Sequence, residues 1–208
     1  MIITRHGNAF LKLAFADKTI AVNPVSKNSK QKTTKFGADI AIANIYHPDF
    51  NGFDQMTFKD KVAFPIKGAG EYEIADIFVK GYGLKQKFEG VDEMMTSYTV
   101  LLDGINIAVF APISSGEEFT NDAIEEFSKA DIFVVPIGGG DMFNPKEAAK
   151  FIKQFAPKIV LPILESSKDD ISEFASALGA EAENSEKLTI KAKDLPENKV
   201  ELVVLKIS

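Results

Sequence analysis

A short segment after an apolar run carries the residues best suited to chemistry. It spans residues 45–52, and one residue separates His47 from Asp49. Imidazole and carboxylate groups are donors for zinc or manganese, and a bound ion acidifies its water and polarises the bond to be cut. Two donors make a weak site, because water must supply most of the ligands. Taken alone, the His47-x-Asp49 pair is therefore a poor metal site, and local hydrogen bonding of His47 and turn capping by Asp49 are the alternatives.

The composition excludes most other metal and nucleophile chemistry. The 208 residues include no cysteine and only two histidines, which excludes thiolate-held zinc, thiol catalysis and disulfide scaffolds. The other histidine, His6, follows the first apolar run and is interpreted as structural or exposed. No Gly-x-Ser-x-Gly motif accompanies either histidine, so a serine triad has no support. The adjacent carboxylates Asp92-Glu93 and Glu117-Glu118 give no specific support to glycosidase chemistry.

A glycine run, Gly138-Gly139-Gly140, precedes Asp141 between a predicted strand and a predicted helix. The N–H groups of such a loop can bind an anion at a helix N-terminus. The run lacks both the Gly-x-Gly-x-x-Gly spacing and the Lys-Ser/Thr of a phosphate loop. A tight strand-to-helix turn is therefore favoured.

The charge balance argues against two classes of partner. With 24 basic and 30 acidic residues the net charge is −6, so we expect neither nucleic acid nor a membrane surface as a partner. Residues 25–35 hold four lysines and are interpreted as a solvated loop rather than a docking site for an acidic partner. No apolar run approaches the roughly 20 residues of a spanning helix, and residues 1–15 lack the apolar core of a signal peptide. The predicted location is the cytoplasm.

Apolar and alternating runs predict β-strands through the first half of the chain. Turn signals at Asp17-Lys18 and Asp103-Gly104 predict two hairpins. The seventeen phenylalanines are expected to pack in the core. The predicted strands are residues 2–4, 10–15, 19–22, 39–43, 62–65, 72–81, 98–102 and 105–110.

Helices and strands alternate in the second half. Asn121 is a plausible cap for the first helix, proline stands at the first position of the second, and Gly179 ends the third. This alternation predicts βα units in an α/β fold, with two packed sheets and helices outside. No Pro/Gly/Ser-rich linker interrupts the chain, so residues 1–208 are expected to form a single domain. The predicted helices are residues 122–127, 145–155 and 169–178, and the predicted strands are residues 131–137, 158–162 and 200–207.

Several segments, in this order and spacing, resemble the metallo-β-lactamase superfamily, in its branch of small bacterial and archaeal metal-dependent hydrolases. The resemblance covers nearly the whole chain and implies a four-layer αββα sandwich. It also implies a cleft at the loop ends of the sheets, where the family binds one or two metal ions for hydrolysis. The segments that carry the resemblance are residues 3–10, 19–24, 38–52, 68–74, 130–139 and 157–162.

The resemblance implies that most of the family's metal ligands are missing. His47 and Asp49 match the second histidine and the aspartate of the His-x-His-x-Asp-His motif. Other residues stand where further ligands or cleft residues are expected. These are Ile45, Phe50 and Leu164 in place of histidines, Ala111-Pro112 in place of Gly-Asp, and Asn8 and Asn23 in place of a histidine and an aspartate.

Two functions from different classes follow. The favoured one is a pseudoenzyme, a non-catalytic binding or assembly protein that needs no cofactor and binds an unidentified small molecule or protein. The alternative is an atypical hydrolase in which His47 and Asp49, with Glu165 or Asp141, hold one weakly bound zinc or manganese ion. Adjacent Ser166-Ser167 make a role at a helix start equally open for Glu165.

The candidates that line the cleft are Asn8, Asn23, Asp141 and Glu165, and no catalytic residue is assigned. A homo-oligomer stays open.

Overall fold

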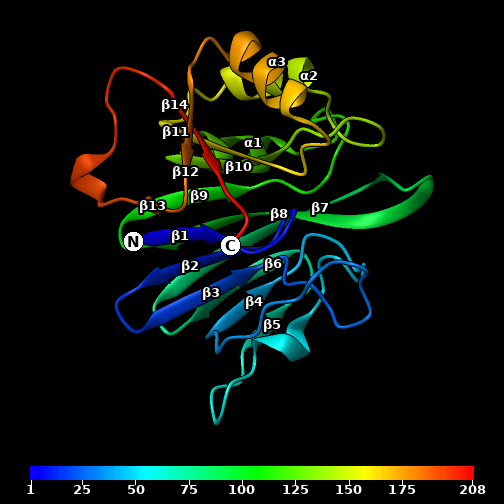
Figure 1. Cartoon of the computed structure of the whole chain (residues 1–208), viewed down its shortest axis with the longest axis vertical. Helices are drawn as coiled ribbons and strands as arrows, with labels where there is room; N and C mark the ends of the chain where they lie inside the picture. The colour runs from blue at the N-terminus through cyan, green and yellow to red at the C-terminus, as the bar shows by residue number, and fades with distance from the viewer.

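Two β-sheets lie face to face in the computed structural model, which describes residues 1–208 (Figure 1). The six-stranded sheet has the order β13 (Leu188–Thr189), β1 (Ile2–Arg5), β2 (Leu11–Phe15), β3 (Lys18–Val22), β4 (Ile40–Ile42) and β5 (Phe64–Ile66). The eight-stranded sheet has the order β12 (Ala182–Ser185), β14 (Glu201–Leu205), β11 (Ile159–Ile163), β10 (Ile132–Pro136), β9 (Ile105–Val109), β8 (Val91–Leu102), β7 (Ile77–Phe88) and β6 (Gly70–Ile74). The predicted α/β fold with two packed sheets is confirmed.

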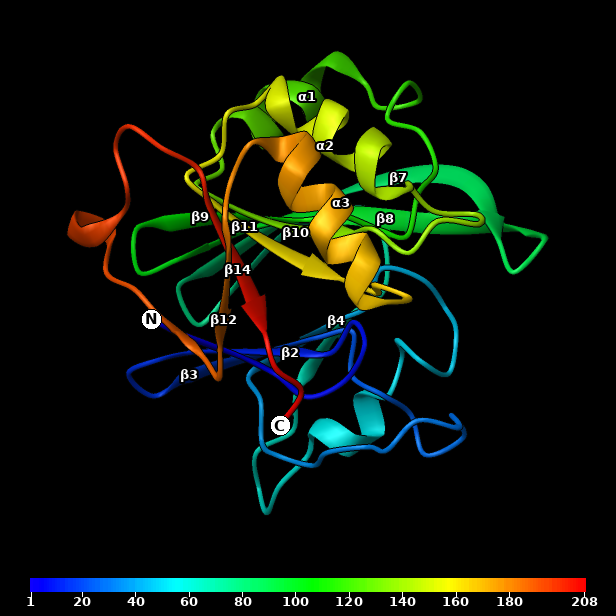
Figure 2. The same ribbon diagram turned by 45° about the horizontal axis from the view of Figure 1, so that its top comes forward.

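Three helices cover the outer face of the eight-stranded sheet: α1 (Asn121–Ser128), α2 (Pro145–Lys153) and α3 (Lys168–Leu178) (Figure 2). Strands β9, β10, β11 and β14 run parallel beneath them, as expected for βα units. Strand β10 is buried along its whole length because it is covered on both faces. No helix combines the length and apolar character that crossing a bilayer requires.

The helix boundaries follow local capping chemistry. The predicted proline at the first position of α2 is confirmed, and Asn144 and Glu147 form a capping box there. Gly179 ends α3 in the left-handed conformation, as predicted. The predicted cap of α1 is wrong by one position: the hydroxyl of Thr120 accepts the N–H of Ala123, and Asn121 is already helical. Both residues are good caps, so local propensity did not separate them.

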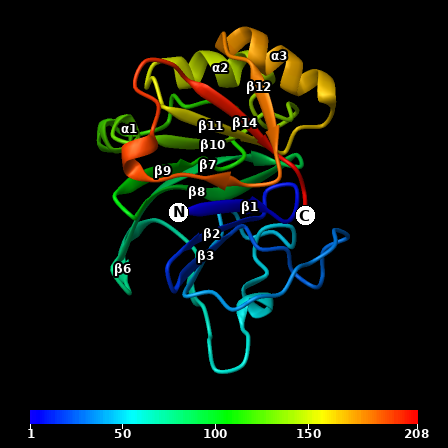
Figure 3. The ribbon, with the colours of Figure 1, turned by 60° about the vertical axis from the view of Figure 1, so that its left-hand side comes forward.

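The outer face of the six-stranded sheet carries loops in place of long helices (Figure 3). The 3₁₀-helix η1 (Phe53–Met56) is the only helical turn in this layer; the other 3₁₀-helix, η2 (Ala192–Asp194), lies near the C-terminus. Small side chains, Ala21 and Ala41, face outward from β3 and β4 and pack with Phe10 in a separate cluster. Short side chains leave room for irregular backbone to approach the sheet closely, so a loop layer suffices to cover this face.

The strand prediction over residues 72–81 is wrong, because two strands occupy this segment. Ala75 and Asp76 both have positive φ and form a tight turn between β6 and β7. The sequence analysis also missed most of the long β7–β8 hairpin, which pairs from Phe78 with Leu101 out to Phe88 with Val91. The Asp103-Gly104 hairpin is confirmed, with positive φ at both residues. The turn predicted at Asp17-Lys18 lies one residue earlier.

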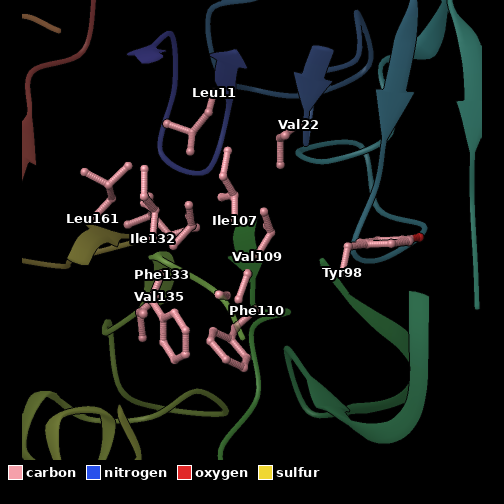
Figure 4. Close-up of a cluster of buried hydrophobic side chains, with 14 of the residues drawn as sticks. Leu11, Val22, Tyr98, Ile107, Val109, Phe110, Ile132, Phe133, Val135 and Leu161 are labelled. Carbon is pink, nitrogen blue, oxygen red and sulfur yellow. The ribbon is translucent and has the colours of Figure 1, made fainter. Parts of the chain in front are cut away.

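The core fills the space between the sheets and beneath the helices (Figure 4). Leu11 and Val22 come from the six-stranded sheet and Ile107 and Val109 from the facing one, and all four are buried. Phenylalanines pack edge to face under the helices around Phe110, as the composition predicted. Its ring centroid lies 4.9 Å from that of Phe127, 5.2 Å from Phe133 and 5.4 Å from Phe151.

Candidate functional site

Loops from both sheets meet at one end of the sandwich and bring the candidate residues together. The N–H of Leu164, after β11, donates to the carbonyl of Asn8, in the β1–β2 loop, over 3.1 Å. The tip of the β7–β8 hairpin reaches Asp141, after β10, and His47, after β4. This end of the molecule, named here the loop end, is where the resemblance leads us to expect a cleft.

His47 is held by its own loop and by the hairpin tip. Its Nδ1 accepts the backbone N–H of Asp49 over 3.3 Å, which leaves the ring proton on Nε2. That Nε2 lies 3.8 Å from Oε2 of Glu89. The ring also meets the edges of Phe88, at 5.3 Å between centroids, and Phe50, at 6.2 Å. An ion at Nδ1 would break the Asp49 hydrogen bond directly, and an ion at Nε2 would require the proton to move to Nδ1, which breaks the same bond.

Asp49 makes a local contact with the lysine-bearing loop. Its Oδ1 accepts a short hydrogen bond from the hydroxyl of Ser29. The loop is tied again where the N–H of Ser26 donates to the carbonyl of Pro48 over 2.8 Å. Asp49 thus connects two loops of the outer layer, and this contact uses an oxygen that an ion would need.

Apolar side chains fill the positions where histidines were expected. Ile45 is 3% exposed and Phe50 is 2% exposed, and both belong to the main core. Ile45 also pairs with Met95 of β8 in an isolated bridge. Leu164 is partly buried against the same core. These positions now contribute packing to the core.

Glu165 pairs with Arg5, a contact that neither interpretation of Glu165 anticipated. Its two oxygens accept from Nη1 and Nη2 of Arg5 over 2.7 and 2.9 Å. Arg5 is 2% exposed, and its Nε and Nη2 also donate to the carbonyls of Gly7 and Asn8 over 3.0 and 2.7 Å. The carboxylate therefore neutralises a buried guanidinium. The residue that caps the start of α3 is Ser167.

The glycine run forms the predicted tight turn. Gly139 and Gly140 have positive φ, and a side chain at Gly138 would collide with the carbonyl of Leu164 at 2.2 Å. Asp141 uses Oδ2 to accept the N–H of Gly90, at the hairpin tip, over 2.6 Å. Asp141 thus fastens the β7–β8 hairpin to the loop end.

Asn23 is fully buried in an amide pair with a residue that the sequence analysis did not single out. Its Nδ2 donates to Oδ1 of Asn44 over 2.6 Å, and its own Oδ1 accepts the N–H of Asn44 over 2.9 Å. Asn44 then donates to the carbonyl of Thr96 over 2.6 Å and joins the two sheets. The position of this polar residue directly after the buried segment 40–43 was the sequence feature that could have identified Asn44. Asn8, in contrast, is exposed.

Two further titratable residues have structural roles. Nε2 of His6 lies 3.1 Å from the hydroxyl of Thr4, and the ring packs against Phe10 and Phe36. Burial, with Lys12 nearby, lowers the pKa of His6. Burial raises the pKa of Tyr98 far above its ordinary value, so its hydroxyl is a permanent donor, here to the carbonyl of Ala43 over 3.0 Å.

The donors present do not fit the metal centre that the resemblance implies. Nowhere in the structure do three or more histidine, cysteine, aspartate or glutamate side chains gather as ligands for one ion. His47 and Asp49 share one loop, while Glu165 and Asp141 are bound to Arg5 and Gly90. A stable site needs at least three protein donors around one point.

Both the sequence and the fold of this chain are similar to those of known proteins. A sequence model described as "Beta-lactamase superfamily domain" matches residues 2–164. A metallo-beta-lactamase superfamily protein from Thermotoga maritima is 21% identical, with a TM-score of 0.76 over 99% of each chain. The isothiocyanate hydrolase from Delia radicum gut bacteria is 12% identical, with a TM-score of 0.65 over 92% of this chain and 100% of that one.

The metallo-beta-lactamase fold protein YhfI from Bacillus subtilis is 12% identical, with a TM-score of 0.62 over 99% of this chain and 96% of that one. At these identities the three structures show a shared fold. No curated protein matches the sequence.

Proposed function

Since this chain belongs to the metallo-β-lactamase superfamily, we propose that it is a non-catalytic member, a binding or assembly protein that keeps the fold without the metal centre. Hydrolysis in this superfamily depends on an ion that activates water, and the ion depends on its full set of ligands. The loop end of this chain brings no three such side chains together in place of that set. Binding through the shape and polarity of the loops needs no ion.

The observation that carries the proposal is the pairing of Glu165 with Arg5. A carboxylate at this place could replace a missing histidine ligand only if its oxygens were free. Both oxygens instead accept charge-assisted hydrogen bonds from a guanidinium that is almost fully buried. Turning Glu165 toward an ion would leave Arg5 buried without a counter-charge, which is costly.

The remaining carboxylate of the alternative, Asp141, is used in a similar way. It accepts the N–H of Gly90 and so holds the β7–β8 hairpin over the loop end. The alternative, an atypical hydrolase with one ion at His47 and Asp49, is supported only by the nearness of these two residues in one loop. Each of them already has a protein partner.

Metal analysis tests the proposal directly. Protein purified without chelator, and again after incubation with zinc or manganese, is measured for bound metal as wild type, His47→Ala and His6→Ala. We expect far less than one ion per chain in all three, and no phosphodiesterase, lactonase or lactamase activity. One ion per chain that His47→Ala removes and His6→Ala retains would overturn the proposal in favour of the single-metal hydrolase.

The partner and location stay predictions of the sequence. An unidentified small molecule or protein is the proposed ligand, without nucleic acid or membrane, and the net charge of −6 supports those exclusions. The cysteine-free composition is compatible with the reducing cytoplasm. Self-association is tested by measuring the molar mass in solution.

A further inference from the structure

A cavity of about 840 Å³ lies between the first turns of α3 and the edge of the eight-stranded sheet at β12 and β14. Figure 3 shows α3 over these two strands, near the C-terminus. Cavities of roughly 300 to 1,000 Å³ hold small organic ligands in other proteins. His47, Asp49, Asn23 and Asp141 do not line it, so it is separate from the centre of the loop end.

The cavity combines an apolar surface with polar groups at its rim. Ile171 of α3, Val204 of β14 and Ile207 contribute apolar side chains to the lining. Val204 is buried, whereas Ile207 is 54% exposed, so the side chain of Ile207 adds exposed apolar surface to the lining. The hydroxyl-bearing Ser166 and Ser172 stand beside this surface. A ligand that fits must therefore carry an apolar part as well as a polar part.

The charges around the cavity indicate which charge the polar group of the ligand carries. Arg5 and Glu165 lie at the inner wall and neutralise each other. Lys206, at the rim, is paired with Glu186 at 2.7 Å. Lys168, in the first turn of α3, lines the cavity and forms no ion pair with the protein. The one uncompensated charge on the lining is therefore positive.

We propose that this cavity binds a small organic carboxylate, with the acid group at Lys168 and an aliphatic chain against Ile171, Val204 and Ile207. The carboxylate forms an ion pair with the exposed ammonium group, and the chain removes the isoleucine side chains from water. The inference does not depend on the proposed function, because the proposed contacts involve no candidate metal ligand, and Glu165, which lines the cavity, is already paired with Arg5.

Three probes separate the two parts of the ligand. Octanoate has both the acid and the chain, octanol has the same chain without charge, and acetate has the acid alone. Binding is followed by the methyl NMR signals of Ile171, Val204 and Ile207 in the full chain. We expect saturable shifts with octanoate, an affinity about fivefold higher than for octanol, and at least about fiftyfold higher than for acetate.

Substitutions locate the binding. Lys168→Gln is expected to lower the octanoate affinity about fivefold, to the level of octanol, while Lys153→Gln, an exposed helix lysine outside the cavity, leaves it unchanged. Ile171→Trp is expected to fill the cavity and abolish binding. Ile207→Trp repeats that test at an exposed position, where a change of size leaves the core intact.

Each contrary outcome overturns the proposal. Unsaturated shifts with octanoate up to about 10 mM exclude a specific site. Equal affinities for octanoate and octanol exclude the acid at Lys168. Unchanged binding in Ile207→Trp places the ligand elsewhere. None of these results alters the metal content at His47, so the two proposals succeed or fail separately.

Discussion

Glu165 accepts two hydrogen bonds from Arg5, which lies 160 residues earlier in the chain, with 2.7 Å from Nη1 to Oε1 and 2.9 Å from Nη2 to Oε2. This pair connects the end of β1 with the segment after β11, and so connects the two sheets. The same Glu165 borders both the loop end and the cavity under α3. The pair therefore gives the loop end a structural carboxylate where the family resemblance led us to consider a metal ligand.

Removing Glu165 is expected to destabilise the fold. Glu165→Ala leaves the guanidinium of Arg5 buried without a counter-charge, and we expect the free energy of unfolding to fall by about 3 kcal/mol. Urea unfolding measures it. Glu186→Ala, which removes an exposed partner of Lys206, is the matched control and is expected to change stability by less than about 0.5 kcal/mol. Equal effects of the two substitutions would contradict the structural role of the Arg5 pair.

The glycine run gives a second stability prediction. In Gly138→Ala the new methyl group would lie 2.2 Å from the carbonyl oxygen of Leu164, so backbone must move, at a cost of about 2 kcal/mol or more. Gly68→Ala meets no atom within 4 Å and is the control. Thermal unfolding of both variants is the measurement. A Gly138→Ala protein as stable as Gly68→Ala would show that the turn has a different geometry.

The pKa of His6 predicts how stability depends on pH. Burial, with Lys12 nearby, lowers this pKa in the folded protein below the ordinary value of 6.5. The unfolded chain therefore binds a proton more readily, and stability falls as the pH drops from about 6.5 through the lower folded pKa. Urea unfolding between about pH 5 and 7.5 is expected to show a smaller acid-dependent loss in His6→Gln than in wild type. The same loss in both proteins would assign the acid sensitivity to other groups.

Metal removal is expected to leave stability unchanged. A ligand at a hundred times its Kd stabilises a protein by about 2.7 kcal/mol, or roughly 5 to 10 °C in Tm for a chain of this size. Because the donors at the loop end are bound to protein groups, we expect no such shift with zinc, manganese or chelator. Differential scanning calorimetry measures it. A zinc-dependent rise in Tm that disappears in Asp49→Asn would contradict the expectation.

The sequence led us to candidate site residues but could not show what each of them contacts. Alignment with the family motif showed that Ile45 and Phe50 stand where histidines were expected, and both side chains are buried in the structure. It could not show that Asp141 holds the hairpin tip at Gly90, because the reach of β7 and β8 was not predicted. It also passed over Asn44, whose amide joins the two sheets. Long-range partners have no signature in the residues beside them.

The sequence by itself determined the features that depend on a few neighbouring residues. These include the alternation of the strands, the Asp103-Gly104 turn and the helix boundaries at Pro145 and Gly179. Backbone preference and side-chain periodicity act over one or two turns, so a local pattern suffices to predict them. Tertiary structure alone decided that Glu165 neutralises Arg5, because that contact forms only when both sheets pack and exclude water from the guanidinium.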